Sequence, residues 1–377
     1  VCLVDPWGSL ELRTSAVLVA TMLASLVVSA VVINWNGQDY LPECLDALLA
    51  QDPPPAEVIV VDNHSDDASR SVVSERYPQV QLIDTGFNGG PCHARNVGAK
   101  AANNERVLFI DNDVVLEPGG LAKLGACMDE HDSIAMVQAR SVCGDDHNIV
   151  HYDGGDLHFL GTLVLRNWYR DLATAEDAPG PIGAAIALCF LAKKSVYEEV
   201  GGFDENLFIL YEDNEFSYKL RMRGHTIRLC AQALCVHKAG TVGLSVRGEA
   251  KYPGKRTYLH SKNRWYVLFT CMRWRTLLLT VPAQLAYGVV YAAFGVGRGH
   301  LGSWLRGKWE LLCLLPKAIR ARGPAQRGRT VPDRELLVAL PMTLNPGLAD
   351  KGAGAWLRRS MDRFFSVYWR LVRGLCG

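Results

Sequence analysis

Short runs of consecutive hydrophobic residues alternate with amphipathic segments over the first third of this 377-residue chain. The hydrophobic runs predict buried strands at Val28–Ile33, Glu57–Val61, Val80–Asp84 and Arg106–Ile110. The segments between them predict helices at Tyr40–Ala50, Asp67–Tyr77 and Pro91–Ala102. Short apolar strands that are each followed by a helix are typical of a doubly wound, mainly parallel sheet with flanking helices. The sequence therefore predicts an α/β fold.

Polar residues follow the predicted strands where each strand ends. Asn34 and Asn36 follow the first strand, Asp62 ends the second, and Asp111 and Asp113 follow the fourth. In doubly wound sheets, ligands bind beyond the carboxyl ends of the strands. We therefore expect a ligand site at this edge of the sheet.

Two of these segments have chemistry that suits a nucleotide. The Asp62 carboxylate at a strand tip is able to accept the ring N–H of a uracil or thymine, although the same residue type also caps turns and helices. Asn88, Gly89 and Gly90 precede a helix that carries Arg95, so the backbone can approach an anion and the guanidinium can pair with a phosphate or a carboxylate. A plain loop leading into a helix is the alternative.

The Asp111 and Asp113 carboxylates suggest a metal site. Mg²⁺ or Mn²⁺ takes one or two such oxygen ligands and completes its shell with diphosphate oxygens and water. His237 follows the apolar stretch Ala231–Val236. A lone histidine in such a place is commonly a hydrogen-bonded core or loop residue, but a metal site with two acids favours it as a third ligand.

A second acidic cluster lies about a hundred residues further on. Asp204, Glu205, Glu212, Asp213 and Glu215 are interleaved with bulky apolar residues. Carboxylates in a partly apolar cleft are candidates for acid–base chemistry, because burial raises the carboxyl pKa. The alternative is a helix N-terminus at which the acids complement the dipole, and both readings are compatible.

The C-terminal third has an uneven charge pattern. The run from Thr276 to Gly297 holds no charged residue, and the stretch from Arg298 to Arg329 holds eight basic residues against Glu310. An apolar run with a basic flank predicts a membrane element whose basic side faces the cytoplasm. A buried helix of a soluble domain is the alternative.

The N-terminal run from Thr14 to Ile33 is also uncharged, but its last part coincides with the first predicted strand. Cleavage there would destroy the strand, so a secretory signal is disfavoured, and Ser15–Ser25 is too short to span a bilayer. We divide the chain into an extension at 1–27, a catalytic domain at 28–260 and a helical, membrane-associated region at 261–377.

Overall composition limits the function classes. A net charge of +1 gives no sign of a nucleic-acid-binding protein. The 11 cysteines are odd in number and scattered, without a C-x-x-C pair, which favours a reducing compartment over a disulfide framework.

Together, five motifs in this order and spacing resemble family 2 glycosyltransferases of the bacterial rhamnosyl- and galactofuranosyl-transferase-like type. The resemblance covers residues 28–240 and rests on Val31–Gly37, Val60–Asn63, Asn88–Gly90 with Ala94–Gly98, Asp111–Asp113, and Gly201–Glu205 with Tyr211–Asp213. It implies a GT-A-like fold and a metal-dependent, inverting single displacement from a UDP- or dTDP-sugar to a hydroxyl of a glycan or lipid-linked acceptor.

The resemblance also implies roles for individual residues. Asp213 is expected to be the general base, with Glu212 on the acceptor side. The expected metal ligands for Mg²⁺ or Mn²⁺ are Asp111, Asp113 and His237. The expected donor-binding residues are Ile33, Asn34, Asn36, Asp62, Asn88, Gly89, Arg95 and Asp111. The expected location is the cytoplasmic face of a bacterial plasma membrane.

Three other functions fit less well. A sugar-nucleotide pyrophosphorylase would need a Gly-rich loop with Arg and Lys after the first strand, and Asn34–Gly37 does not provide one. A non-catalytic sugar-nucleotide-binding module would be expected to lack the acids that this chain retains. An NAD oxidoreductase would need the G-x-G-x-x-G pattern, which is missing after the first strand.

Overall fold

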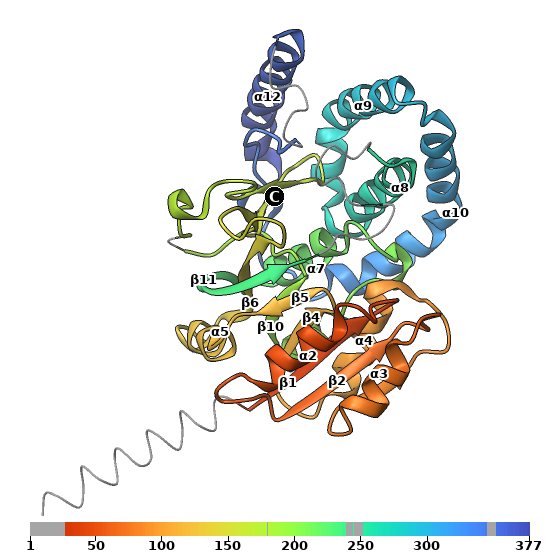
Figure 1. Cartoon of the computed structure of the whole chain (residues 1–377). Helices are drawn as coiled ribbons and strands as arrows, with labels where there is room; N and C mark the ends of the chain where they lie inside the picture. Colours follow the sequence, from red (N-terminus) through yellow and green to blue (C-terminus); the bar gives the residue numbers. More distant parts are fainter. Residues whose placement is uncertain (1–26, 179, 239–243, 245–251, 345–351) are drawn as a thin grey trace, which may run out of the picture.

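The computed structural model describes residues 27–178, 180–238, 244, 252–344 and 352–377. A nine-stranded sheet with the order β3-β2-β1-β4-β10-β6-β11-β5, with β7 beside β6, forms the centre of the molecule (Figure 1). Its strands are β1 (Val28–Asn34), β2 (Glu57–Asp62), β3 (Gln81–Asp84), β4 (Arg106–Asp111), β5 (Val114–Leu116), β6 (Ile134–Cys143), β7 (Val150–Tyr152), β10 (Cys189–Lys193) and β11 (Thr226–His237). β8 (Gly155–Leu157) and β9 (Leu163–Leu165) form a separate hairpin.

The N-terminal half of the sheet is parallel, as the sequence predicts, because β3, β2, β1 and β4 all pair in the same direction. The other half is mixed. β10 is antiparallel to both of its neighbours, β4 and β6, whereas β6 and β11 are parallel. Between β6 and β10 the chain runs through short strands and loops rather than a crossover helix, and a reversed strand needs no such crossover.

Helices cover both faces of the sheet because side chains alternate along each strand. Ala30 and Val32 of β1 belong to the apolar cluster that α2, α3 and α5 complete, and Val31 and Ile33 belong to the opposite cluster, with α4, α6 and α7. These helices are α2 (Leu41–Leu49), α3 (Ser69–Arg76), α4 (Gly90–Ala101), α5 (Gly120–Asp129), α6 (Lys194–Glu199) and α7 (Glu212–Met222).

One glycine lets α4 lie close to the sheet. A Cβ atom added to Gly98 would come within 2.2 Å of Val31 Cγ1, so a larger residue would push the helix away from β1. The close approach keeps Arg95, one turn earlier on α4, next to the carboxyl end of β4.

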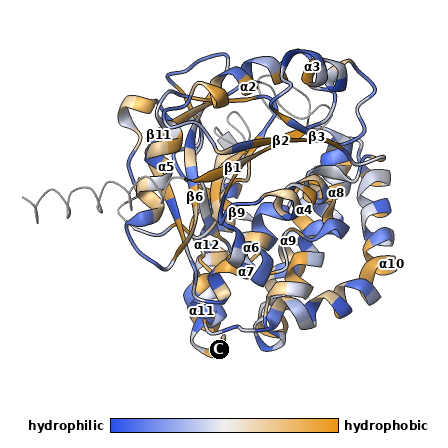
Figure 2. Ribbon diagram, turned by 90° about the horizontal axis from the view of Figure 1, so that it is seen from below, coloured by the Kyte–Doolittle hydropathy of each residue, from blue (hydrophilic) through white to orange (hydrophobic). Residues whose placement is uncertain are grey.

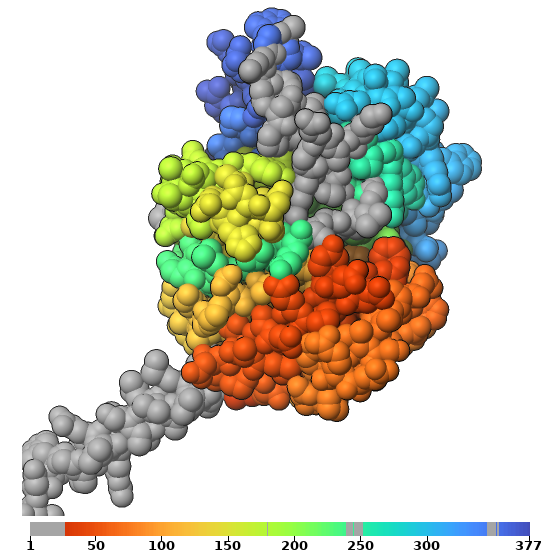
Figure 3. Space-filling model, in the orientation of Figure 1, coloured from red at the N-terminus to blue at the C-terminus, as the bar shows by residue number. Residues whose placement is uncertain are grey.

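The C-terminal third is helical. Figure 1 shows α8, α9 and α10 as neighbouring helices, with α12 on the other side of α9, and in Figure 3 they occupy the opposite end of the molecule from the first two strands. The helices are α8 (Gly254–Cys271), α9 (Trp274–Gly297), α10 (Leu301–Gln326), α11 (Asp333–Leu336) and α12 (Gly352–Val372).

α8 continues through residue 260, where the sequence places the end of the catalytic domain. Tyr266 and Leu268 of α8 are buried in the same apolar cluster as α7. Any division of the chain near residue 260 therefore cuts a helix that belongs to the main core. The proposed N-terminal extension lies outside the described residues except for Val27.

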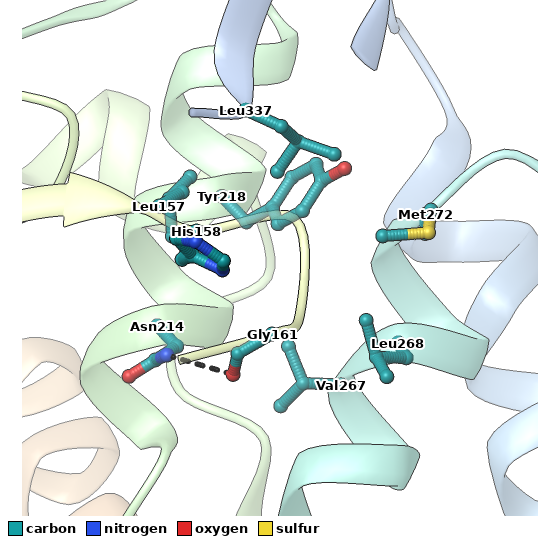
Figure 4. A pocket seen from close by; sticks show the side chains of 9 residues that line it. All are labelled: Leu157, His158, Gly161, Asn214, Tyr218, Val267, Leu268, Met272 and Leu337. Carbon is teal, nitrogen blue, oxygen red and sulfur yellow. Dashed lines mark hydrogen bonds between the residues drawn. The ribbon is translucent and has the colours of Figure 1, made fainter. Parts of the chain in front are cut away.

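Dense packing fixes α7 against α8. Between them lies a void of only about 10 Å³, which is lined by Tyr218 of α7 and by Val267, Leu268 and Met272 of the α8 segment (Figure 4). A space of that size holds at most roughly one water molecule. The Asn214 side chain also donates to the Gly161 carbonyl at 3.3 Å, so the first turn of α7 is tied to the loop beside it.

Among the described residues, α9 is the one helix that is long and apolar enough to cross a membrane: an 18-residue stretch of it has a mean hydropathy of 1.6, and 22% of that stretch is buried. Figure 2 shows apolar and polar residues interspersed along the C-terminal helices. Length and composition by themselves do not distinguish a span from a surface helix.

Candidate active site

Polar side chains join the tips of three adjacent strands. The Asn34 side chain at the end of β1 donates to Asp62 Oδ1 at 2.6 Å and accepts from the Asn112 side chain at 2.7 Å. Ser65 also donates to both Asp62 oxygens, through its hydroxyl at 2.6 Å and its backbone N–H at 2.8 Å. The network holds the loop after β4 in place. A Cβ on Gly37 would collide with Asn112 Nδ2 at 1.8 Å, so this loop also requires a glycine opposite it.

Asp111 and Arg95 form a buried ion pair. Arg95 Nη2 lies 2.8 Å from Asp111 Oδ1 and also donates to the Ala187 carbonyl. Burial raises the pKa of Asp111 to about 6, although Arg95 opposes the shift. Arg95 is part of the cavity lining, and its Nε and Nη1 are buried without a hydrogen-bond partner among the described residues.

Asp113 and His237 come together although 124 positions separate them in the chain. β5 pairs with β11 so that His237 lies opposite Val114, and His237 Nε2 is 3.3 Å from Asp113 Oδ2. His151 of β7 approaches the other side of the imidazole, with 3.0 Å between the two Nδ1 atoms. A carboxylate and an imidazole are therefore side by side at the carboxyl edge of the sheet.

This pair fits a divalent cation that takes few protein ligands. Within the described ranges, no group of three or more His, Cys, Asp and Glu side chains is close enough to hold a metal by itself. Asp111 Oδ1 accepts from Arg95, and the charges of Asp113 and His237 also act on the Asp111 carboxyl. Mg²⁺ and Mn²⁺ sites that recruit diphosphate oxygens and water need only one or two protein groups, which Asp113 and His237 are able to supply.

The two acids that open α7 differ in exposure. Glu212 is 7% exposed, and its Oε2 is buried without a partner, whereas Asp213 is partly exposed and accepts from the Ala187 N–H at 3.1 Å. Burial, together with the negative charge of the neighbouring Asp213, raises the pKa of Glu212 to about 8. Burial also raises the pKa of Asp213, to about 6, against the opposing charge of Arg95. At neutral pH, Asp213 is thus the better proton acceptor of the two.

A strained turn at residues 208–211 directly precedes Glu212 and Asp213 and sets their position. Phe208, Leu210 and Tyr211 all have φ values between 64° and 81°, a region that side chains with a Cβ rarely adopt. Asn263 of α8 stabilises the turn by donating to the carbonyls of Leu207, Ile209 and Leu210, at 3.0, 3.0 and 2.6 Å. A residue outside the motifs, in the C-terminal helices, therefore holds the start of α7.

Many of these groups line one cavity of about 1270 Å³. Of the expected site residues, the cavity is lined by Ile33, Asn36, Asn88, Arg95, Asp111, Asp113, Glu212, Asp213 and His237. Asn34, Asp62 and Gly89 are not part of its lining. Asp62 is fully buried, and its two carboxylate oxygens accept hydrogen bonds from Asn34 and Ser65. Its observed contacts are therefore with the polar network at the strand tips.

Several lining residues carry no signal in the sequence. They are His151, Trp168, Tyr169, Tyr252 and His260. They come from loops and helices whose patterns show no motif, and the Trp168 indole N–H is buried without a partner among the described residues. Only the folding of distant segments around one cavity identifies them.

The comparisons with known proteins point in one direction. Residues 29–201 match the model of glycosyl transferase family 2. The chain is 26% identical over 267 residues to the N-acetylglucosaminyl-diphospho-decaprenol L-rhamnosyltransferase of Mycobacterium tuberculosis, covering 63% of this chain and 85% of that enzyme. It is 36% identical over 124 residues to the Staphylococcus aureus poly(ribitol-phosphate) beta-N-acetylglucosaminyltransferase TarS, which covers 31% of this chain and 21% of TarS.

A solved structure of S. aureus TarS 1–349 in complex with UDP is 18% identical and covers 92% of this chain and 91% of that chain, with a TM-score of 0.47. The sequence relatives and the motif-bearing cavity define this chain as a glycosyltransferase, an enzyme that transfers sugars. More particularly, residues 29–201 form a glycosyltransferase family 2 domain, and the mixed sheet with flanking helices is GT-A-like. The predicted family, the GT-A-like fold class and the helical nature of the C-terminal region are thereby confirmed.

Proposed function

We propose that this enzyme moves a sugar from a UDP- or dTDP-sugar to a hydroxyl of a lipid-linked glycan, with inversion at the anomeric carbon. The observation that carries the proposal is the placement of Asp213, Arg95 and the Asp113–His237 pair around a single cavity. A single displacement needs one base for the acceptor hydroxyl and positive charge for the departing diphosphate. A retaining glycosidase instead needs two carboxylates about 5 Å apart.

The donor end of the cavity lies at the strand tips. Ile33, Asn36 and Asn88 line it where a nucleoside would lie, and the guanidinium of Arg95, which also belongs to the lining, would pair with the diphosphate. Asp113 and His237 would hold Mg²⁺ or Mn²⁺, which when bound supplies positive charge for the departing nucleoside diphosphate. Asp111 would act mainly by orienting Arg95.

Asp213 would accept the proton of the attacking hydroxyl. Its carboxylate is partly exposed in the cavity, the Ala187 N–H fixes one oxygen at 3.1 Å, and its pKa of about 6 leaves it ionised at neutral pH. Glu212, buried and with a pKa of about 8, would remain protonated beside it and orient the acceptor or the turn.

The lipid-linked acceptor is supported by the mycobacterial relative, whose name gives N-acetylglucosaminyl-diphospho-decaprenol as its acceptor and L-rhamnose as its sugar. That relative is similar over most of its length, so a related acceptor class is the simplest proposal for this chain.

A panel of nucleotide sugars tests the reaction. Purified full-length protein with Mn²⁺ or Mg²⁺ should release nucleoside diphosphate from one UDP- or dTDP-sugar, EDTA should stop the release, and NMR of the product should show the opposite anomeric configuration from the donor. Retained configuration, or full activity in EDTA, would contradict the mechanism proposed here.

We also propose that the enzyme works at the cytoplasmic surface of a membrane. Most of the exposed large apolar side chains of the described residues lie on the C-terminal helices, including Trp309 and Leu312 of α10, at 69% and 62% exposure. Basic residues such as Arg306 and Arg320 lie on the same helix. Exposed apolar surface beside positive charge is typical of proteins that bind anionic lipid surfaces.

Vesicle sedimentation tests this surface. We expect the full chain to sediment with vesicles that contain anionic phospholipid, and the double variant Trp309→Glu/Leu312→Glu to bind at least about tenfold more weakly, because two apolar contacts are replaced by negative charges. Phe87→Glu, at a 56%-exposed aromatic of the catalytic half, is the matched control and should bind like the wild type. Equal binding by the two variants would count against the proposed surface.

A further inference from the structure

The catalytic cavity is larger than a donor site requires. Its volume of about 1270 Å³ exceeds the range of roughly 300–1,000 Å³ that is usual for small-molecule pockets. Beyond the acid pair it continues between the C-terminal helices. We call this part the helical arm, and its defining residues are Tyr252, Arg256, Tyr287, Val290, Phe294 and Leu357.

A chain of contacts joins the acid pair to the helical arm. Tyr211, next to Glu212, shares a hydrogen bond of 2.8 Å with His260 Nδ1, and His260 Nε2 lies 3.3 Å from the Tyr287 hydroxyl. The His260 ring stacks on Tyr291 with 3.8 Å between centroids, and the Tyr291 and Tyr252 hydroxyls are 3.0 Å apart. The wall of the cavity is therefore continuous from the catalytic acids to the far end of α9.

The lining of the helical arm is amphiphilic. Val290 and Phe294 of α9 and Leu357 of α12 contribute hydrocarbon, while Lys255 and Arg256 at the start of α8 contribute positive charge. The Arg256 guanidinium lies 6.0 Å from the centre of the Tyr252 ring and donates to the Leu244 carbonyl at 3.1 Å. Hydrocarbon beside two cations complements a molecule with an anionic head and an apolar tail, and a free polar glycan does not need such a lining.

α9 has an inner face that binds it to the body of the enzyme. Thr280 and Gln284 are fully buried, and Tyr287 and Tyr291 follow on the same side of the helix. The Gln284 side chain donates to the Phe159 carbonyl at 2.8 Å and accepts from Arg264 at 2.6 Å. Crossing a bilayer would require these buried polar groups to lose their partners, so we infer that α9 lies along the membrane surface rather than across it.

The outer face of α9 is apolar and exposed. Leu278, Leu285, Val289 and Val296 are 53–70% exposed, and apolar residues of α10 and α12 are exposed as well. Val289 is both 70% exposed and part of the cavity lining. The mouth of the helical arm thus opens at the surface that we place against the lipid.

We propose that the helical arm binds the diphosphate and the first isoprenoid units of a polyprenyl-diphosphate-linked acceptor, with Lys255 and Arg256 on the diphosphate. The rest of the hydrocarbon chain leaves past Val289 into the lipid leaflet. This inference rests on the proposed function, and it assigns the lipid part of the acceptor to this chain's own residues. The acceptor sugar then extends from the arm toward Asp213, along the wall formed by His260 and Tyr211.

Farnesyl diphosphate is a suitable soluble probe, because it carries the diphosphate and three isoprenoid units without a bilayer. Its binding to the full chain is measured by calorimetry without vesicles, with Mn²⁺ and enough UDP present to fill the donor site. We expect it to bind more tightly than inorganic diphosphate or farnesol. Val289→Glu and Arg256→Gln should each weaken its binding by about tenfold or more, through repulsion at the mouth and loss of a cation.

Leu278→Glu is the matched control, because Leu278 is as exposed as Val289, lies on the same helix and is not part of the cavity lining. This variant should bind farnesyl diphosphate like the wild type while losing affinity for vesicles. Equal effects of Val289→Glu and Leu278→Glu on the probe, or binding no tighter than that of inorganic diphosphate, would overturn the assignment of the arm.

The assay also separates this inference from the proposed function. Release of nucleoside diphosphate from the nucleotide sugar, measured with water as the acceptor and without any lipid, tests the donor end of the cavity by itself. If no nucleotide sugar is hydrolysed or transferred, the proposed reaction is wrong, whatever farnesyl diphosphate does. If donor turnover is normal and the probe does not bind, the reaction stands and the helical arm is not the lipid site.

Discussion

Asp213→Asn should leave donor binding intact and lower turnover by about 10²–10⁴-fold, the usual loss for a general base. The amide keeps the size of the side chain and an oxygen to accept the Ala187 N–H, so the start of α7 should not move. It has no basic oxygen to take the proton of the acceptor hydroxyl. Turnover by product formation and donor affinity by calorimetry are the two measurements.

The pH dependence gives an independent readout. Because the pKa of Asp213 is raised by burial to about 6, the carboxyl becomes protonated as pH falls through that value, and turnover of the wild type should decline by about tenfold per pH unit below it. Asp111 titrates in the same range. If the decline belongs to Asp213, the residual activity of Asp213→Asn should lack it, and a decline that persists in the variant would point to Asp111.

Glu212→Gln is the matched control for the neighbouring acid. Adjacent residues on a helix point about 100° apart, so only one of the two can face the acceptor hydroxyl. Glu212 is buried and its pKa is about 8, so it holds a proton at neutral pH and the amide should cost much less than Asp213→Asn. An inactive Glu212→Gln beside an active Asp213→Asn would reverse the assignment of the base.

Asp113→Ala should remove the Mn²⁺-dependent part of nucleoside diphosphate binding and lower turnover by about a hundredfold or more. The physical reason is that His237 alone cannot hold the cation whose charge balances the departing diphosphate. Calorimetric titration of nucleoside diphosphate with and without Mn²⁺ measures the effect directly. The wild type should bind more tightly with the metal, and the variant should bind equally in both conditions.

Asp129→Ala provides the comparison, because Asp129 pairs with Arg106 and is not part of the cavity lining. It should retain the metal dependence of the wild type. Metal-enhanced binding that survives in Asp113→Ala would show that the cation lies elsewhere, and the roles of Asp113 and His237 would have to be revised.

The sequence by itself determined the N-terminal half of the fold. The strands β1, β2, β3 and β4 and the helices between them lie within one or two residues of their predicted bounds, because buried strands and amphipathic helices leave strong local patterns. Motif order likewise determined the family. These features depend on residues that are close together in the sequence, so the local spacing of hydrophobic residues is enough to predict them.

Tertiary structure decided which of the motif residues meet. β5 and β11 bring His237 to Asp113 and leave Asp111 with Arg95, so the three expected metal ligands do not form one group. Asp62 is likewise taken up by the network at the strand tips. Such pairings depend on register between strands far apart in sequence, and no local pattern encodes that register.

The role of the C-terminal third was also beyond the sequence. Its uncharged run predicted a membrane element, but the pattern did not reveal that α8 supplies Asn263 to the turn before Glu212 and Asp213, or that Gln284 binds one face of α9 to the core. Both contacts join segments more than fifty residues apart. Hydropathy measures how apolar a helix is, and only packing decides which face meets protein and which is left exposed.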